Sequence, residues 1–320
     1  MSEKKIYHIL PLYKSFVWGG RKLIDQYHLD TDQENIGTIY HVIAIPGQLD
    51  NMVAETGQPL SVFYANNPDL FGCHESIFPI RMTTTCNEGK QSYQLHPDDD
   101  YAMKRQGEKG KVSGSVAIHA TDEIHTTLFG NRAKNMAEFK RMVETKDWEH
   151  LFDHLKVRDG QFVHTPAGVI HGGIGRGTIK LTFGTNGDVT YRFYDYDRND
   201  TKRPLNLQEV YDCVNIPELP LSATDGETVI KNGVQITTYH SVPGEYVAKR
   251  IKNKDEGVFS YRGFYFITCV DGKGTICGET IKPADTLFVP VGSGCLDLSG
   301  NMDLAFISYI DRKDVNNVPD

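Results

Sequence analysis

Short runs of apolar and β-branched residues, broken by Gly, Pro, Asn and Asp, make up most of this chain. The clearest examples are the segments 38–47, 114–121, 161–168, 177–184, 263–276 and 285–292. Runs of this length and composition, with turn-forming residues between them, are typical of short β-strands. The pattern therefore predicts a mainly β protein of the sandwich or barrel type.

Helical periodicity interrupts the strands in a few places. Segment 135–144 begins with Asn135 and carries Glu138 three positions later, which is the spacing of a capping box, and its apolar residues recur at helical intervals. A second short helix is predicted to start near Asp147. Further helical turns are predicted at 20–28 and 60–66.

Two segments of the chain repeat one pattern, a strand that ends in a Pro-x-Gly turn. Residues 160–171 align with 284–295, and the matched positions are Pro166 with Pro290, Gly168 with Gly292, and His171 with Cys295. The second half of a small cupin barrel has this form, so we expect a duplicated barrel in which only the first copy holds metal chemistry. The alternative is two unrelated strand-turn segments, because such turns are common.

Composition and charge exclude some classes of function. The 320 residues are 39% hydrophobic and 24% charged, which is ordinary for a globular protein. The net charge of -8 argues against a general surface for nucleic acid or anionic membrane, although a local basic pocket for a small phosphate remains open. The sequence carries no apolar run of signal-peptide or membrane-spanning length, so cytoplasmic residence is the default expectation.

The six cysteines are scattered, without the close pairs of a zinc ribbon or the density of a disulfide scaffold. We interpret them as reduced and mostly structural, with a thiol nucleophile as the alternative.

The best candidates for metal chemistry are Gln94, His96 and His171. Gln94 and His96 are two residues apart in a strand-like run, so their side chains point to one face and can converge on one ion. His171 follows in the segment 166–173, PAGVIHGG. A glutamine oxygen and two imidazoles are plausible ligands of a divalent transition metal.

In order along the chain, four segments resemble the type I phosphomannose isomerases, most closely the short bacterial members. They are FVWGGRKL at 16–23, YQLHPDDDYA at 93–102, PAGVIHGG at 166–173 and DVTYRFYDYDR at 188–198. The resemblance covers the first two thirds of the chain, whereas 220–320 matches only in general barrel pattern.

The resemblance implies a fold of two cupin (jelly-roll) barrels with a helical insertion. We assign residues 1–125 and 156–215 to the N-terminal barrel, 126–155 to the insertion, and 216–320 to a C-terminal barrel without metal ligands. It also implies an aldose-ketose isomerase that interconverts mannose 6-phosphate and fructose 6-phosphate on a bound zinc. The sequence leaves the oligomeric state open.

The same resemblance assigns roles to individual residues. Gln94, His96 and His171 correspond to metal ligands of the family. Arg192 corresponds to the family's arginine, which stabilises the enediolate or steers the sugar phosphate. We place Lys111, Thr182 and Asp188 among the substrate-binding residues.

The chain departs from the family where a glutamate ligand is expected, because that position holds Ser113. A neutral hydroxyl is a poor zinc ligand, so we expect zinc to bind weakly or not at all. Thr38, Thr83 and Thr182 likewise stand where the family carries ionisable residues. The pocket is expected to be a degenerate active site that is short of titratable groups for proton transfer.

Two arrangements would rescue the metal site. Asp98 could serve as a ligand after a local shift, although the run of three aspartates from Asp98 more often caps a helix that begins near Tyr101. Three protein ligands plus water is also a normal count for an open catalytic zinc site.

Three functions remain open at this stage. The protein is a slow or altered sugar-phosphate isomerase, with mannose 6-phosphate, fructose 6-phosphate or a related compound as substrate. Alternatively, it is a catalytically inactive member that binds a sugar or sugar phosphate in a regulatory or assembly role. In the third hypothesis its role is purely structural, and the retained histidines are relics.

Overall fold

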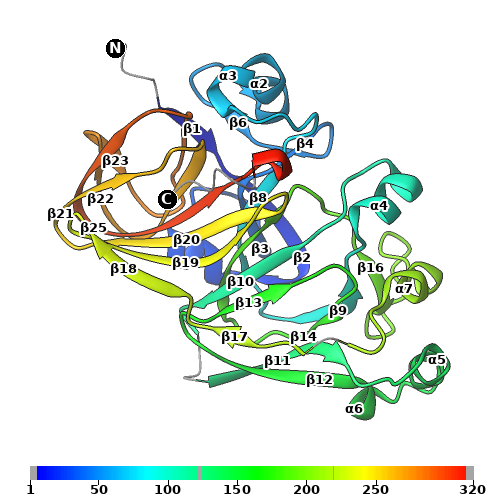
Figure 1. Cartoon of the computed structure of the whole chain (residues 1–320). Coiled ribbons are helices and arrows are strands. Elements are labelled where there is room, and N and C mark those ends of the chain that lie inside the picture. The colour runs from blue at the N-terminus through cyan, green and yellow to red at the C-terminus, as the bar shows by residue number, and fades with distance from the viewer. Residues whose placement is uncertain (1–5, 121–123, 219, 315–320) are drawn as a thin grey trace.

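The described residues of this computed structural model, 6–120, 124–218 and 220–314, form antiparallel β-sheets joined by short helices. The chain starts beside the C-terminal strands, crosses to the other end of the molecule, and returns for its last hundred residues (Figure 1). The prediction of a mainly β protein is confirmed. No helix in these ranges is long and apolar enough to cross a membrane.

Two sheets from the N-terminal two thirds of the chain face each other. The first runs in the order β17-β13-β10-β15-β8-β3-β2, and the second in the order β12-β11-β14-β9-β16. Strands of the first sheet are β2 (Leu12–Gly20), β3 (Ile36–Val42), β8 (Ile80–Cys86), β10 (Ser113–Ile118), β13 (Phe162–Thr165), β15 (Ile179–Thr185) and β17 (Ala223–Thr224). Strands of the second are β9 (Lys90–Leu95), β11 (Ile124–Asn131), β12 (Phe152–Arg158), β14 (His171–Ile174) and β16 (Tyr191–Tyr194).

The largest sheet belongs mostly to the C-terminal third. Its main order is β18-β19-β20-β25-β22-β24-β1-β6-β7, with β21 on β25 and β23 on β22. Its C-terminal strands are β18 (Glu227–Lys231), β19 (Val234–Val242), β20 (Tyr246–Asn253), β21 (Glu256–Ser260), β22 (Tyr265–Ile276), β23 (Glu279–Ile281), β24 (Thr286–Val289) and β25 (Cys295–Ser308). The N-terminal strands β1 (Tyr7–Leu10), β6 (Met52–Val53) and β7 (Gln58–Pro59) complete it, while β4 (Ala44–Ile45) and β5 (Leu49–Asp50) form a separate hairpin.

The helices are short and lie outside the sheets (Figure 1). They are α1 (Lys22–Tyr27), α2 (Leu60–Asn66), α3 (Pro68–Phe71), α4 (Asp99–Gln106), α5 (Met136–Glu144), α6 (Trp148–Leu151), α7 (Leu207–Cys213) and a 3₁₀ turn, η1 (Arg312–Asp314). The helices predicted at 20–28, 60–66 and 135–144 and near Asp147 are confirmed. Asp98 caps α4 by accepting a hydrogen bond from the Tyr101 amide, so the capping interpretation of that residue is also confirmed.

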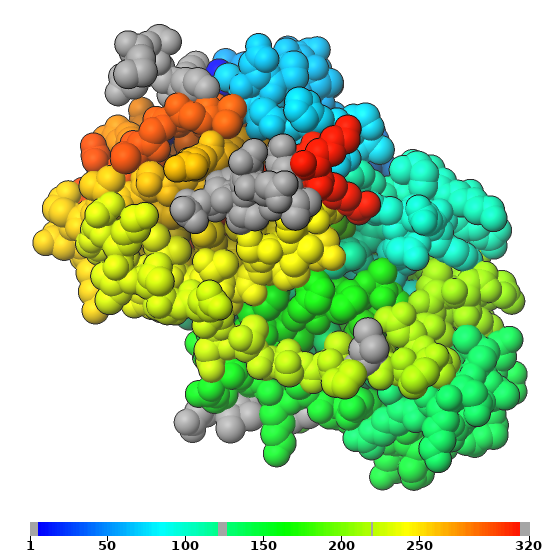
Figure 2. Space-filling view, in the orientation of Figure 1, coloured from blue at the N-terminus to red at the C-terminus, as the bar shows by residue number. Residues whose placement is uncertain are grey.

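Side chains along the central strands of the first sheet point alternately into the hydrophobic core and into a cavity. In β15, Leu181 and Phe183 belong to the main hydrophobic core, whereas Lys180 and Thr182 line the cavity on the opposite face. The same core contains side chains of the C-terminal sheet, such as Phe288. One face of the first sheet therefore packs against the C-terminal part of the molecule. The contact between the two parts is visible in Figure 2, in yellow and green.

The repeated strand-turn pattern has the same form in both copies. In the first, β13 and the turn lead to β14, which begins at His171, and in the second, β24 and the turn lead to β25, which begins at Cys295. Gly168 and Gly292 occupy matching turn positions with φ of 80° and 69°, a region that glycine adopts at little cost. The two copies therefore share local structure, and the ligand-type residue is replaced by cysteine in the second. No disulfide joins any of the six cysteines, which all lie in described ranges.

Candidate metal and substrate site

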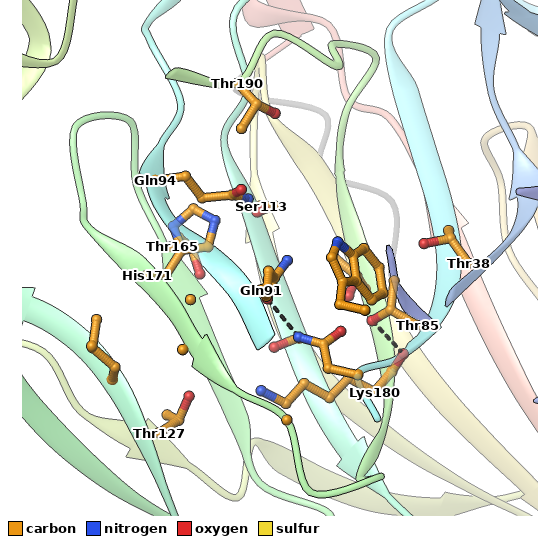
Figure 3. Close-up of a pocket in the computed structure, with 18 of the residues that line it drawn as sticks. Thr38, Thr85, Gln91, Gln94, Ser113, Thr127, Thr165, His171, Lys180 and Thr190 are labelled. Carbon is orange, nitrogen blue, oxygen red and sulfur yellow. Dashed lines mark hydrogen bonds between the residues drawn. The ribbon is translucent and has the colours of Figure 1, made fainter. Parts of the chain in front are cut away.

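A cavity of about 660 Å³ lies between the two N-terminal sheets, and both sheets supply its lining. Gln94 and His171 enter from the second sheet, while Ser113, Thr165 and Lys180 enter from the first (Figure 3). Apart from Asp98, the residues to which the sequence assigned a role in the site all contribute to this one lining. They are Gln94, His96, Lys111, Ser113, His171, Thr182, Asp188 and Arg192.

Strand register brings the candidate metal ligands together. Gln94 of β9 is directly paired with His171 of β14 on one side and with Arg192 of β16 on the other. His96 follows β9, and its ring centroid lies 4.8 Å from that of His171. Residues that are far apart in the sequence thus converge because β9 is flanked by β14 and β16.

Backbone carbonyl groups fix the orientation of both imidazoles. His96 Nδ1 lies 2.8 Å from the Val189 carbonyl oxygen, and His171 Nδ1 lies 3.0 Å from that of Val169. A ring that donates from Nδ1 keeps its Nε2 lone pair available to a metal, which is the usual arrangement of ligating histidines. Gln94 Oε1 accepts a hydrogen bond of 2.8 Å from the Ser92 hydroxyl, which holds the amide in place.

The two histidines are neutral at physiological pH. Burial, followed by the charge of Lys111, holds the pKa of His96 well below its ordinary value. Burial lowers the pKa of His171 to about 4, against an opposing effect of the Val169 carbonyl. Because a histidine must be deprotonated to bind a metal, both rings are in the required state.

Ser113 lies at the start of β10, on the wall opposite the histidines, and it is buried. The donor set of the site is therefore an amide oxygen, two imidazoles and a hydroxyl. These groups fit a divalent ion of the zinc class in type and orientation, but they offer it no negative charge. The structure thus supports a site with three good neutral ligands.

Cations dominate the charged residues of the lining, although the chain as a whole carries a net charge of -8. The basic residues are Lys14, Arg81, Lys111, Arg176, Lys180, Arg192 and Arg203. Asp188 is the single carboxylate that the described residues contribute to the lining. A cavity with this balance attracts anions and concentrates them near its walls.

The one carboxylate is engaged by neighbouring cations. Asp188 Oδ1 accepts a hydrogen bond of 2.8 Å from the buried Arg81 guanidinium, and Lys14 lies 3.9 Å from the other oxygen. Burial opposes ionisation of Asp188, but Arg81 and Lys111 outweigh it, so the pKa of the carboxyl is lowered. Asp188 therefore stays ionised.

The amine of Lys111, in the cavity lining, ionises near neutral pH. Burial and the charge of Arg81 lower the pKa of its amine to about 7, while Asp188 acts in the opposite direction. An amine with such a pKa can both take up and release a proton under physiological conditions. The sequence led us to expect a pocket short of titratable groups, but Lys111 can titrate near neutral pH.

Arg192 has a buried hydrogen-bond donor that no described residue satisfies. Its Nε atom is buried without a hydrogen-bond partner among the described residues. Burial and the nearby Arg203 lower the pKa of Arg192 from its ordinary value, which means that two guanidinium groups lie close enough to repel each other. An anionic ligand in the cavity would relieve both features.

Hydroxyl groups make up much of the remaining wall (Figure 3). Thr38, Thr83, Thr85 and Thr182 line the cavity from β3, β8 and β15 of the first sheet. Thr83 Oγ1 is buried without a hydrogen-bond partner in the described part of the chain. Hydroxyls of this kind can bind the hydroxyl groups of a sugar, but they cannot titrate near neutral pH.

Other candidates from the sequence have structural roles. Asp98 caps α4 and does not belong to the lining formed by the described residues, so it is not placed to replace the missing carboxylate ligand. His41 is fully buried, and its Nε2 lies 2.8 Å from Thr84 Oγ1. Burial lowers the pKa of His41 to about 3, which makes it a neutral core residue.

Sequence reasoning missed several lining residues, above all Arg81, Lys180 and Trp18. Strand parity carried a signal for the first two, because Arg81 is two residues from Thr83 and Lys180 is two residues from Thr182. Trp18 is likewise two residues from Phe16 and four from Lys14 along β2, and all three line the cavity. The Trp18 ring stacks on that of Phe16 at 4.4 Å.

Comparisons with known proteins agree with this architecture. A mannose-6-phosphate isomerase of Streptococcus mutans is 33% identical over 234 residues, which covers 71% of this chain and 72% of the relative. The crystal structure of the mannose 6-phosphate isomerase from Bacillus subtilis superposes with a TM-score of 0.88 at 24% identity, covering 95% of this chain and 99% of that one. The predicted cupin fold is thereby confirmed. No family model matches the chain.

A zinc-bound mannose 6-phosphate isomerase shares the fold more distantly. Its TM-score is 0.72 at 13% identity, with 96% of this chain and 100% of that chain covered. At this identity the likeness concerns the fold alone.

Proposed function

The chain belongs to the mannose-6-phosphate isomerase family, and we propose that it isomerises a sugar phosphate between its aldose and ketose forms at a weakened metal site. Mannose 6-phosphate and fructose 6-phosphate, or closely related hexose phosphates, are the proposed substrates. The observation that carries the proposal is the cavity itself, in which Gln94, His96 and His171 converge beside Arg192 under a strongly cationic lining.

Gln94, His96 and His171 are the residues that would hold the metal. When bound, a divalent ion such as zinc would polarise the oxygens carried by the two adjacent carbons between which the proton moves. We propose that the affinity for zinc is lower than in a site with a carboxylate ligand, since Ser113 supplies no charge and Lys111 repels a cation. Water would complete the coordination, as in other three-ligand sites.

The remaining residues of the cavity bind, orient and exchange protons. The cationic lining supports binding of the phosphate dianion, and the threonines support hydrogen bonds to sugar hydroxyls. Arg192 is proposed to stabilise negative charge on an enediolate oxygen through its unpartnered donor. Lys111 is proposed to move the proton between adjacent carbons, because its pKa of about 7 allows both protonation states.

A second candidate function is sugar-phosphate binding without catalysis, in a regulatory or assembly role. It is favoured by the scarcity of carboxylates, since Asp188 alone contributes one within the described lining and is held by Arg81. In this version the cations and hydroxyls retain a ligand, and no group performs efficient proton transfer.

The first test is an isomerase assay on metal-stripped, tag-free protein. Zinc, manganese or cobalt is added back, and fructose 6-phosphate formed from mannose 6-phosphate is measured against a His96→Ala control. Activity above the control in at least one metal supports the isomerase. Equal rates in the two proteins for all metals would exclude it.

A thermal-shift panel of hexose phosphates then tests binding separately from catalysis. A ligand at 100 times its dissociation constant should add ~2.7 kcal/mol to the free energy of unfolding. Arg192→Ala should reduce this gain, whereas Lys202→Ala, at an exposed surface cation, should leave it unchanged. Stabilisation without turnover favours the second candidate function. If the protein shows neither stabilisation by hexose phosphates nor turnover, both candidate functions are contradicted.

A further inference from the structure

A second cluster of metal-ligating side chains lies at the junction of the two parts of the molecule. His164, His240 and Glu245 each offer one ligand atom, and these atoms lie within 4.8 Å of one another. His164 comes from β13 of the N-terminal part, His240 from β19, and Glu245 from the turn between β19 and β20. Figure 1 shows β19 and β20 running beside β10 and β13 at this junction.

The cluster is separate from the cavity described above. Val163 and Thr165 line that cavity, so the side chain of His164, between them on β13, points to the opposite face of the sheet. That face packs against the C-terminal part, where the His164 ring lies 4.7 Å from the His240 ring, with 18° between the planes.

Local backbone features direct the other two side chains towards His164. The register of β19 on β20 shifts between Thr238 and His240, and such a bulge changes where the next side chain points. The turn that follows contains Gly244 with φ of 81°, which returns the chain so that Glu245 lies beside His240. His240 Nε2 and Glu245 Oε2 are 2.9 Å apart.

Aromatic side chains partly close the cluster to solvent, and the charge of Arg312 acts on Glu245. The side chain of His240 is 11% exposed and that of Glu245 is 30% exposed. The His240 ring stacks on Tyr246 at 4.3 Å, and His164 Nδ1 lies 3.3 Å from the Tyr246 hydroxyl. The cluster is therefore neither fully buried nor fully exposed.

We propose that His164, His240 and Glu245 form a binding site for a divalent transition metal of the zinc class, which joins the two barrels. Two imidazoles and one carboxylate with water are a known ligand set of four-coordinate zinc. Zinc bonds of about 2.0 Å at tetrahedral angles put neighbouring ligand atoms about 3.3 Å apart. Small side-chain rotations therefore suffice to close the cluster on an ion.

The charge state of the cluster supports this assignment. Burial, followed by His240, lowers the pKa of His164 to about 4, so its ring is neutral and able to coordinate. The hydrogen bond from His240 lowers the pKa of Glu245 despite burial, so the carboxylate is ionised. This cluster thus has the negative ligand that the cavity site has lost.

If the proposed site binds a metal, it is an exception to one expectation from the sequence. Residues 216–320 were expected to contribute no metal ligands, yet His240 and Glu245 belong to that range. The expectation concerned the position of Cys295, which matches His171 inside the first barrel. The cluster lies instead on the outside of the barrels, where the repeated pattern gives no information.

The test is zinc titration of tag-free, chelator-stripped full-length protein, with bound metal counted after buffer exchange. His96→Ala/His171→Ala removes the cavity donors, and this double variant should still bind one equivalent of zinc. Adding His240→Phe, which keeps a ring against Tyr246, should weaken the remaining binding by roughly 100-fold or more. If the protein with His240→Phe folds poorly, Glu245→Gln is added to the double variant in its place, and it should likewise weaken zinc binding.

His8→Gln is the matched control, because His8 and Glu55 form a similar pair at 2.7 Å without a second histidine. It should leave the binding unchanged. Zinc should also raise the unfolding temperature of the double variant, and the rise should be lost with His240→Phe or Glu245→Gln. The proposal is overturned if the double variant binds no zinc, or if these further substitutions leave its affinity unchanged.

Discussion

We propose that Ser113 limits how strongly the cavity can hold a metal. It lies in the wall that faces Gln94, His96 and His171, and its neutral hydroxyl adds no negative charge to a donor set that has none. We predict that Ser113→Glu tightens zinc binding by roughly 100-fold or more and raises isomerase activity, because a carboxylate balances the charge of the ion. Zinc titration and the mannose 6-phosphate assay measure the two effects.

Ser115→Glu is the matched control for that substitution. Ser115 also lines the cavity, but it lies two residues further along β10, which is about 6.6 Å away. A carboxylate there adds the same charge without the same position. Equal tightening by both substitutions would show that general charge, and not a lost ligand position, limits the affinity.

Asp188 holds the cationic wall together. Removing its charge leaves the buried Arg81 without its anionic partner, so Asp188→Asn should lower the free energy of unfolding by about 3 kcal/mol at pH 7. Asp153→Asn breaks an exposed pair with Arg132 and should cost less than about 1 kcal/mol. Urea unfolding of the two variants measures the difference.

The contribution of Asp188 to the free energy of unfolding should depend on pH. The pKa of Asp188 is lower in the folded protein than its ordinary value of about 3.9. The folded state therefore binds this proton less readily than the unfolded state, and the stabilisation is present above about pH 4 and lost as pH falls through the folded pKa. The gap between wild type and Asp188→Asn should shrink below pH 4, and a constant gap would contradict this origin.

The individual residues of the site were predictable in part. Gln94, His96, His171 and Arg192 lie in segments long enough to be recognised, and strand register then brings them together. Arg81 was missed because a charged residue between apolar ones in a strand normally faces solvent. Only the closure of two sheets over one cavity shows that this face is interior.

At the scale of elements, α5 tests how far local sequence determines local structure. Asn135 accepts a hydrogen bond of 2.9 Å from the Glu138 amide, and Glu138 in turn accepts one of 2.8 Å from the Lys134 amide. Asn135→Ala should therefore cost about 1 kcal/mol in free energy of unfolding. Chemical denaturation measures this cost.

Arg21→Ala is the control for the cap. Arg21 occupies the same position in α1 without a side-chain cap hydrogen bond, so its replacement should change stability by less than about 0.5 kcal/mol. If Asn135→Ala were equally silent, the capping interaction would not contribute to the stability of this protein.

Elements defined by local signals were predicted well, and those defined by distant pairing were not. The strands, the cap of α5 and the Pro-x-Gly turns depend on neighbouring residues, which a single sequence displays. The placement of β1, β6 and β7 in the C-terminal sheet depends on pairing with β24, across most of the chain. The cluster of His164, His240 and Glu245 likewise exists only once the two parts are packed together.

At the scale of the whole molecule, the two parts share one hydrophobic core. Phe288 of β24 stacks on Phe71 at 4.4 Å and contacts Phe63. The same core includes Met82 of β8 and Leu181 of β15, on the face of the first sheet that points away from the cavity. Burial of this kind couples the stability of both parts, because neither can expose its side of the core alone at low cost. We expect a single cooperative unfolding transition.

Phe288→Ala tests this coupling from one part to the other. The substitution should cost about 3 to 5 kcal/mol. Both tryptophans, Trp18 and Trp148, lie in the N-terminal part, so their fluorescence reports on the part that was not changed. In urea, the fluorescence and far-UV circular dichroism transitions should move together to lower concentration, because the shared core must open in both parts at once.

Val229→Ala is the control, because the Val229 side chain on β18 is 57% exposed. It should leave both the fluorescence transition and the circular dichroism transition at the wild-type urea concentration. A fluorescence transition that stays in place while the circular dichroism divides into two steps would mean that the barrels unfold independently.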